Sequence, residues 1–435
     1  MAIIVPFRAW RYDPRKVRLE DVVTQPYDKI SPEMQDRYYS ASPNNLVRII
    51  LGKAESGDNE EFNVYSRAKD SFRSWREQGV LRHDLEPSIY AYQQHFKVPG
   101  DPTGMRHRRS GFIALGRIQD YSDKVVFRHE QTLSKPKADR LNLLRATHGH
   151  FGQIFMLYRG GHDPLASLTP PPTAQVRDEY GVDHKVWKIS DARLIAQVQH
   201  ELADKQLIIA DGHHRYETAL AFRDEMRAKN PSAGPEAPWE YVMMTFINMD
   251  APGLVILPTH RVVRGLESFQ MADLISRASQ FFAAEEVTSR FHPDQPLDLL
   301  GDDAPHYVYR STLLAVGRDR AYLLRAKPGA SELALPEISA KERELDVVQL
   351  HKLLLEKTLG MSEEDVRTQK YLSYIRDPKE AVETVRSGTA QVAFLMNPVR
   401  IEQMRDIAFG GGVMPQKSTD FYPKLLSGLT IYALD

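Results

Sequence analysis

The chain has 435 residues and no cysteine, and its 57 Lys and Arg residues almost balance its 58 Asp and Glu residues. This balance gives no electrostatic reason to expect a nucleic-acid or membrane partner, and the lack of cysteine excludes disulfides and thiolate metal sites. A chain of this length exceeds one hydrophobic core, so two or three substructures are expected. No stretch approaches the roughly 20 apolar residues of a membrane span, and we therefore expect a soluble cytoplasmic protein.

The first predicted region, residues 1–120, mixes short strands, turns and one long helix. "AIIVPF", "TQPYDKIS" and "NNLVRIIL" indicate short strands and polar turns, and "SIYAYQQHF" and "RSGFIALGRI" indicate a hairpin across the Gly/Pro loop at 97–105. Between them, "EFNVYSRAKDSFRSWREQGVL" predicts an amphipathic helix. Its apolar face would contain Phe62, Tyr65, Phe72 and Trp75. This pattern is typical of an α+β region.

The second predicted region, residues 121–229, contains the polar motifs. A strand-like "KVVF" precedes His129 and Glu130, and a helix follows. Further on, "DARLIAQVQHELADK", "QLIIA" and "RYETALAFRDEMRAK" predict a helix, a strand and a helix, with "DGHH" as the tight turn before the second helix. An insertion with the loop "TPPPT" is expected near 160–190.

The third predicted region, residues 230–435, alternates strands and helices. "YVMMTFINM", "GLVILPTHRVV" and "TLLAVGRDRAYLLRA" predict strands, the last as a hairpin around "GRDR". "DVVQLHKLLLEKTLG" predicts one core helix ending at Gly360, and Ser362 is expected to cap the next helix.

The stretch from Asp211 to Arg215, "DGHHR", has the residues of an anion site. A helix amino terminus presents unpaired N–H groups and partial positive charge, and a glycine lets a ligand approach the backbone. Arg215 offers a planar fork for phosphate or carboxylate, while His213 and His214 can donate hydrogen bonds or exchange protons. The plainer alternative is that Asp211 caps the helix and the histidines pair with the backbone.

A second polar cluster follows the strand that precedes residue 129. Its charged residues are His129, Glu130, Lys135, Lys137, Asp139 and Arg140. Reacting side chains are often displayed at strand ends in α/β frameworks. By spacing alone, a charged helix entry on a solvated surface is the preferred interpretation of this cluster.

The "HE" dipeptide after a strand, followed later by "DGHHR" at the start of a helix, resembles the free-serine kinases of the ParB/sulfiredoxin superfamily. The wider chain, including "PYDKIS", "LPTHR" and "MPQKSTDFYPKLLSGL", resembles an uncharacterised bacterial family, domain of unknown function 1015. The resemblance implies an α+β fold with a ParB/sulfiredoxin-like core, a long insertion and strand-rich flanking regions.

The same resemblance implies phosphoryl transfer between a nucleotide, ATP or ADP, and free serine or phosphoserine, with Mg²⁺ accompanying the nucleotide. Glu130 would bind the amino acid or act as base, and Asp211 would orient or deprotonate the hydroxyl. His213, His214 and Arg215 would hold the phosphoryl group on the turn at Gly212. His129, Lys137 and Arg140 are further candidates for the substrate and phosphate site.

Two other stretches are weaker candidates. Lys417 and Ser418 follow three glycines in a loop that could close over a phosphorylated ligand, although the spacing is not that of a P-loop. Tyr27 and Asp28 lie in a similar loop. His148 and His150 could join the other histidines around zinc, but nothing in their spacing fixes one cluster, and we expect no metal site.

Two alternatives to the phosphotransferase remain open. A phosphoserine phosphatase would use the same pocket with a different acceptor. A nucleotide-binding or DNA-associated ParB-like protein without enzymatic activity is the other, and the neutral charge and lack of a basic tail disfavour it. The sequence does not indicate an oligomeric state.

Overall fold

The computed structural model describes residues 2–131, 134–161, 171–300 and 311–435. This part of the chain forms two compact units, both of which combine strands with helices, so the α+β class is confirmed. A ParB/sulfiredoxin-like core stays a prediction. Unit 1 comprises Met1–Arg128, Thr132–Val255 and Tyr422–Asp435, and unit 2 comprises His129–Gln131 and Ile256–Phe421.

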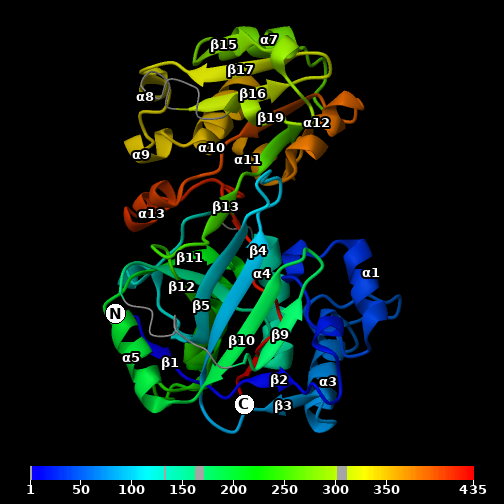
Figure 1. The fold of residues 1–435 in the computed structure, drawn as a ribbon, viewed down its shortest axis with the longest axis vertical. Helices are drawn as coiled ribbons and strands as arrows, with labels where there is room; N and C mark the ends of the chain where they lie inside the picture. Colours follow the sequence, from blue (N-terminus) through cyan, green and yellow to red (C-terminus); the bar gives the residue numbers. More distant parts are fainter. Residues whose placement is uncertain (1, 132–133, 162–170, 301–310) are drawn as a thin grey trace. The chain divides into compact units, whose positions relative to one another are not determined.

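The central feature of unit 1 is a mixed sheet with the strand order β6-β11-β8-β12-β5-β4-β10-β9, and β1 pairs with β5 (Figure 1). β4 and β5 form the predicted antiparallel hairpin, with Tyr90 opposite Ile113. β11 runs parallel to β6 and antiparallel to β8. The strands are β1 Ile4–Val5, β4 Ile89–Lys97, β5 Arg106–Arg117, β6 Val126–Phe127, β8 Ile154–Tyr158, β9 Ala174–Arg177, β10 Asp183–Ile189, β11 Leu207–Asp211 and β12 Tyr241–Asn248.

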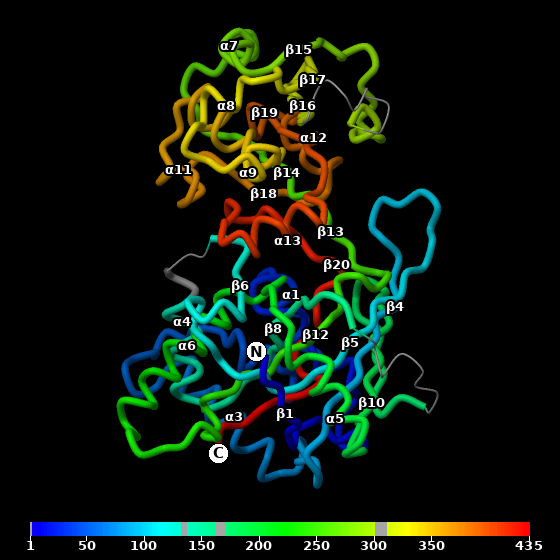
Figure 2. Tube along the Cα trace, turned by 90° about the vertical axis from the view of Figure 1, so that its left-hand side faces the viewer, coloured from blue at the N-terminus to red at the C-terminus, as the bar shows by residue number. Residues whose placement is uncertain are grey.

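The core of unit 1 lies against this sheet. Alternate strand residues such as Ile209 and Met244 pack with α5 and α6, which contribute Val198 and Tyr216. The neighbouring helix α4 packs against α6 (Figure 2). The strands are buried on both faces, which explains why "LIIA" is continuously apolar. The helices of unit 1 are α1 Pro32–Ala41, α2 Val47–Ile50, α3 Val64–Glu77, α4 Ser134–Thr147, α5 Ala192–Leu202 and α6 His213–Lys229.

Two small sheets complete unit 1. β2, Trp10–Tyr12, pairs with β3, Leu81–His83, and β7, Gly149–His150, pairs with β21, Tyr432–Ala433. A second apolar cluster joins α3 to the C-terminal Ile431. The "NNLVRIIL" stretch forms the short helix α2 instead of the predicted strand. Its residues Val47, Ile49 and Ile50 are buried, and Ile49 and Ile50 belong to this cluster.

The predicted long helix begins two residues later than its apolar pattern indicates. Phe72 and Trp75 are buried on α3, but Phe62 precedes the helix and is 68% exposed, so its placement on the apolar face was wrong. The reason is the cap: Asn63 accepts from the N–H groups of Tyr65 and Ser66 at 2.9 and 3.2 Å, and the Ser66 hydroxyl accepts from Asn63 N–H. This capping box starts the helix after Phe62.

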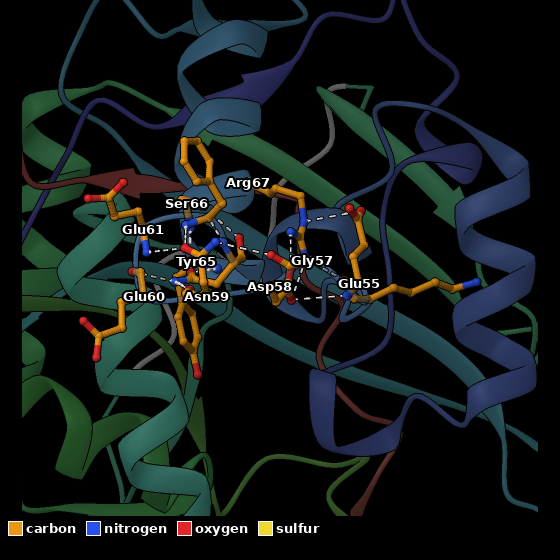
Figure 3. Close-up of polar contacts among 12 residues, drawn as sticks. Glu55, Gly57, Asp58, Asn59, Glu60, Glu61, Tyr65, Ser66 and Arg67 are labelled. Atoms are coloured by element: carbon orange, nitrogen blue, oxygen red, sulfur yellow. Dashed lines mark hydrogen bonds and ion pairs between the residues drawn. The ribbon is translucent and has the colours of Figure 1, made fainter.

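The loop before α3 is a local polar network (Figure 3). Arg67 pairs with Asp58 and lies 3.6 Å from Glu55, while Asn59 accepts from the N–H groups of Glu61 and Phe62. These bonds satisfy the loop's own backbone and charges, so they explain the turn without a ligand.

Unit 2 is built on an antiparallel sheet with the order β15-β17-β16-β19-β14-β18 (Figure 1). The predicted "GRDR" hairpin is confirmed as β16 and β17. The "GLVILPTHRVV" strand is interrupted at Pro258, which lacks an N–H donor, and forms β13 and β14. The strands are β13 Val255–Leu257, β14 His260–Val263, β15 Phe282–Glu286, β16 Thr312–Val316, β17 Ala321–Ala326, β18 Leu372–Ile375, β19 Val392–Met396 and β20 Asp420–Tyr422.

The predicted core helix of unit 2 is only partly α-helical. It begins as α10, continues as a π-helix over Leu350–Thr358, and ends before Gly360, which has φ +74°. Ser362 caps the next helix with a capping box, as predicted. The helices are α7 Met271–Ala278, α8 Ala330–Ala334, α9 Ala340–Arg343, α10 Asp346–Gln349, α11 Glu363–Arg367, α12 Pro378–Arg386 and α13 Ile401–Phe409.

The two units divide the chain differently from the three predicted regions. Regions 1–120 and 121–229 both contribute strands to the sheet of unit 1, because β5 pairs with β12 and β12 with β8. The third region supplies β12 and the C-terminal residues of unit 1 as well as most of unit 2. The predicted insertion near 160–190 includes β9 and β10, and its residues 162–170 lie outside the described residues.

Candidate functional site

The "DGHHR" stretch of unit 1 is the turn between β11 and α6. Gly212 is the N-cap of α6, has φ +93° and ψ +27°, and no side chain caps the helix. A Cβ on Gly212 would lie 3.0 Å from the guanidinium of Arg215. Glycine is therefore required both by the left-handed backbone and by the close arginine.

Asp211 does not cap the helix, so the plainer alternative for this residue is wrong. Its Oδ2 accepts a hydrogen bond from Arg215 Nη2 at 2.9 Å, and its Oδ1 lies 3.5 Å from Lys424 Nζ. Burial alone would raise the pKa of Asp211, but Lys424, Arg215, Lys29 and His213 hold the pKa well below its ordinary value. Asp211 is therefore an ionised carboxylate within an excess of positive charge.

Lys424 was not among the candidates from the sequence. The fold of unit 1 brings it next to Asp211. Arg109 on β5 is 1% exposed and donates to the carbonyls of Tyr422 and Pro423 and to Gln94 Oε1. Gln94 in turn donates from Nε2 to the Lys424 carbonyl at 2.8 Å. These bonds fix the backbone on both sides of Lys424. The sequence offered one signal for this arrangement, which is that Arg109 lies within a strand predicted to be buried.

A cavity of about 70 Å³ lies beside Arg215 within unit 1. Arg140 stacks over the ring of Tyr27 at 4.1 Å on its wall. Thr218 is 4% exposed, and its hydroxyl has no hydrogen-bond partner among the described residues. The remaining wall is largely apolar and includes Leu143, Leu144, Phe151 and Val242. A cavity of this size admits a few water molecules or a small polar group.

The other candidates in unit 1 lie around the same helices. Lys137 on α4 is 4.0 Å from Glu217 on α6, and Arg140 donates to Asp139 at 2.8 Å. His213 and His214 are half-buried in the first turn of α6. The structure thus brings the predicted α4 and α6 residues into one unit.

The "HE" dipeptide belongs to unit 2, where it pairs with the loop around Lys417. Met414 N–H donates to the His129 carbonyl at 2.9 Å, and Lys417 N–H donates to Glu130 Oε1 at 2.7 Å. His129 is fully buried, and its Nε2 is 2.7 Å from Thr419 Oγ1. Two stretches that the sequence analysis treated separately therefore form one structure.

Ser418 bonds within its own loop, and the ligand contact expected for it stays a prediction. It is 5% exposed, and its hydroxyl donates to the Pro415 carbonyl at 2.5 Å. In this structure the side chain therefore closes its own loop. Because His129–Glu130 and Asp211–Arg215 lie in different units, their pairing stays a prediction.

Resident metal ions do not fit these residues. Both carboxylate oxygens of Asp211 already face cations. Among the described residues, no three His, Cys, Asp or Glu side chains are grouped as metal ligands. Mg²⁺ thus stays a prediction tied to the nucleotide phosphates. Within the described ranges, no helix has the length and apolar character to cross a membrane.

The fold and these two polar clusters define an α+β protein with a cationic strand-to-helix turn. The family model "Protein of unknown function (DUF1015)" matches residues 4–348, so the chain belongs to this family. A comparison with curated proteins gives no match.

Several solved structures align weakly with the chain. A free serine kinase in complex with AMP is 12% identical with a TM-score of 0.33, covering 69% of this chain and 84% of that chain. A conserved hypothetical protein from Pyrococcus furiosus is 12% identical with a TM-score of 0.35, covering 71% and 91%. SbnI with a C-terminal truncation, from Staphylococcus aureus, is 11% identical with a TM-score of 0.32, covering 74% and 87%. TM-scores this low do not establish a shared fold.

Proposed function

We propose that this protein is a phosphotransferase that moves a phosphoryl group between a nucleotide, ATP or ADP, and free L-serine or phosphoserine. The observation that carries the proposal is the cationic turn of unit 1. Around the carboxylate of Asp211 lie Arg215, Lys424, Lys29 and His213. A phosphate would be balanced by this charge and would meet the N–H groups at the start of α6.

In the forward direction, the serine hydroxyl oxygen attacks the terminal phosphorus of the nucleotide. A new P–O bond forms, the bond to the bridging oxygen breaks, and the shortened nucleotide leaves with that oxygen. Phosphoryl transfer depends mainly on positioning and on positive charge around the transferred oxygens. Arg215 and Lys424 are the groups proposed to supply that charge.

The two carboxylates have different proposed roles. The lowered pKa of Asp211 makes it a poor proton acceptor, so its role is to orient Arg215 and Lys424. Glu130 is proposed to accept the hydroxyl proton, a role that the resemblance to free-serine kinases implies.

The direct test is to incubate the full chain with L-serine and either ATP or ADP, and to measure phosphoserine by mass spectrometry. Phosphoserine formation is expected with one of the two nucleotides. Release of inorganic phosphate from phosphoserine without a nucleotide would favour the phosphatase instead. If neither product forms, the proposed function is wrong.

A variant pair tests the turn itself. We expect Arg215→Met to lower the rate by about 100-fold, the usual cost of removing one group that stabilises transition-state charge. Arg227→Met is the matched control because Arg227 lies on the same helix and pairs with Glu240. Equal rates for the two variants would remove the turn from the proposed site.

A further inference from the structure

Arg261, in the "LPTHR" stretch of unit 2, is buried within a complete set of acceptors. The residue lies on β14 and is 1% exposed. Its Nη2 donates to the carbonyls of Gln416 and Lys417 at 3.3 and 3.0 Å, and its Nη1 donates to the Thr259 carbonyl. A buried guanidinium pays a large desolvation cost, so these bonds are needed to keep it in place.

The Arg261 guanidinium also contacts two side chains, His351 and Tyr374. Nε donates to His351 Nε2 at 3.2 Å, and the Tyr374 ring lies 4.7 Å from the guanidinium carbon. Burial lowers the pKa of His351 well below its ordinary value, so the imidazole is neutral and can accept this bond. His351 lies in the π-helix, a rare conformation that is frequent at functional sites.

The loop that Arg261 holds has a strained residue at its centre. Lys417 has φ +57°, which costs a non-glycine residue about 1 kcal/mol. Its carbonyl accepts from Arg261, and its N–H donates to Glu130 Oε1. Gln416 is anchored separately, because its Nε2 donates to the Arg367 carbonyl at 3.1 Å. Lys417 is thus held from both sides, by Arg261 and by Glu130.

We propose that Arg261 is a positioning residue for Glu130, acting through the Gln416 and Lys417 carbonyls to hold the Lys417 N–H against the carboxylate. The chain of contacts is His351, Arg261, the loop and Glu130, and all of it lies in unit 2. Arg261 also interacts electrostatically with Glu130, an attraction that opposes the lowering of the Arg261 pKa by burial. The role of Arg261 in positioning Glu130 does not depend on which reaction the protein catalyses. Its effect on catalysis rests on the proposed function.

Lysine cannot replace this arginine fully. The acceptors of Arg261 lie in several directions and engage Nε and both Nη atoms, which matches a planar fork and not a single ammonium group. Arg261→Lys should therefore keep the charge and lose part of the positioning, whereas Arg261→Met loses both.

The test is hydrogen–deuterium exchange of the full-length protein, read on peptides that cover residues 414–421. Arg261→Met is expected to speed exchange of the Lys417 amide at least tenfold, and Arg261→Lys by a smaller factor. Glu130→Ala, which removes the acceptor of that amide, is expected to give a similar local increase. Arg290→Met, at an arginine that is 55% exposed in the same unit, is the matched control and should leave the peptide unchanged.

Exchange in the β16–β17 hairpin, measured in the same experiment, distinguishes a positioning role of Arg261 from a general loss of stability in unit 2. If Arg261→Met leaves the Lys417 amide as protected as in the wild type, the proposal is overturned. An equal increase throughout the β16–β17 hairpin overturns it too, since Arg261 would then support the whole unit and not the loop. Both outcomes are read without any activity assay.

A kinetic measurement connects the inference to the proposed function. If the chain makes phosphoserine, Arg261→Met should lower kcat at least tenfold and change the nucleotide KM by less than threefold, because the proposed phosphate site lies in unit 1. A larger change in KM than in kcat would contradict this role. If no phosphoserine forms, the proposed function fails while the exchange result still decides the positioning role.

Discussion

A buried arginine in each unit fixes a different part of the C-terminal segment. In unit 1, Arg109 donates to the carbonyls of Tyr422 and Pro423, next to Lys424, which faces Asp211. In unit 2, Arg261 donates to the Gln416 and Lys417 carbonyls, and the Lys417 N–H faces Glu130. Each arginine therefore orders the residue that contacts a motif carboxylate.

The two units differ in the groups that contact their motif carboxylates, Asp211 in unit 1 and Glu130 in unit 2. Asp211 is met by side-chain cations, which lower its pKa and attract further anions. Glu130 Oε1 accepts a hydrogen bond from the Lys417 backbone N–H, and the buried Arg261 also interacts electrostatically with Glu130. The cations around Asp211 support the proposed binding role of the turn in unit 1, and the proton-accepting role of Glu130 stays a proposal.

The largest expected effect is on the buried arginine of unit 1. Arg109→Met should lower the free energy of unfolding by about 3–5 kcal/mol, because it leaves several buried acceptors without a donor. Chemical denaturation of the full chain measures this loss. Arg106→Met, on the same strand but 54% exposed, should cost less than about 0.5 kcal/mol. Similar costs for both variants would mean that Arg109 does not fix the segment.

A smaller effect is expected at the glycine of the turn. Gly212→Ala should cost about 1–2 kcal/mol from the left-handed backbone, and should also weaken ADP or phosphate binding about tenfold because the new Cβ displaces Arg215. Isothermal titration calorimetry measures the affinity. Gly181→Ala is the matched control, since Gly181 has φ +75° and open space around it. It should show the backbone cost alone, and a tenfold affinity loss there would refute the role of Arg215.

The last expected effect concerns acid stability beside Arg261. Burial, followed by the nearby Arg261 charge, lowers the pKa of His260 to about 4, and Asp377 opposes this only partly. The neutral imidazole thus stabilises the fold above pH 6.5, and this contribution is lost as the pH falls toward 4. His260→Asn should flatten the pH dependence of unfolding in that window, by at most about 1.4 kcal/mol per pH unit.

Denaturation of unit 2 at several pH values, followed by a unit-specific probe, checks this expectation. His292→Asn, at an exposed histidine, is the control and should leave the slope unchanged. An unchanged slope in His260→Asn would show that His260 does not remain neutral on folding.

Elements with strong local signals were predicted well. The hairpin of β4 and β5, the strand, turn and helix around Gly212, and the cap at Ser362 all follow from short-range patterns. Predictions failed where a local cap or burial overrode the pattern: Asn63 excludes Phe62 from α3, and residues 47–50 become helical on a buried cluster.

The sequence by itself determined the α+β class, the glycine turn with its adjacent Arg215, and the acidic and basic residues of both motifs, because these depend on neighbours within a few positions. Only the tertiary structure decided which distant residues meet them. Lys424 is 213 positions from Asp211, and Lys417 is 287 positions from Glu130. Contacts at such separations depend on sheet pairing and on buried arginines that order the C-terminal segment, and no local pattern specifies these.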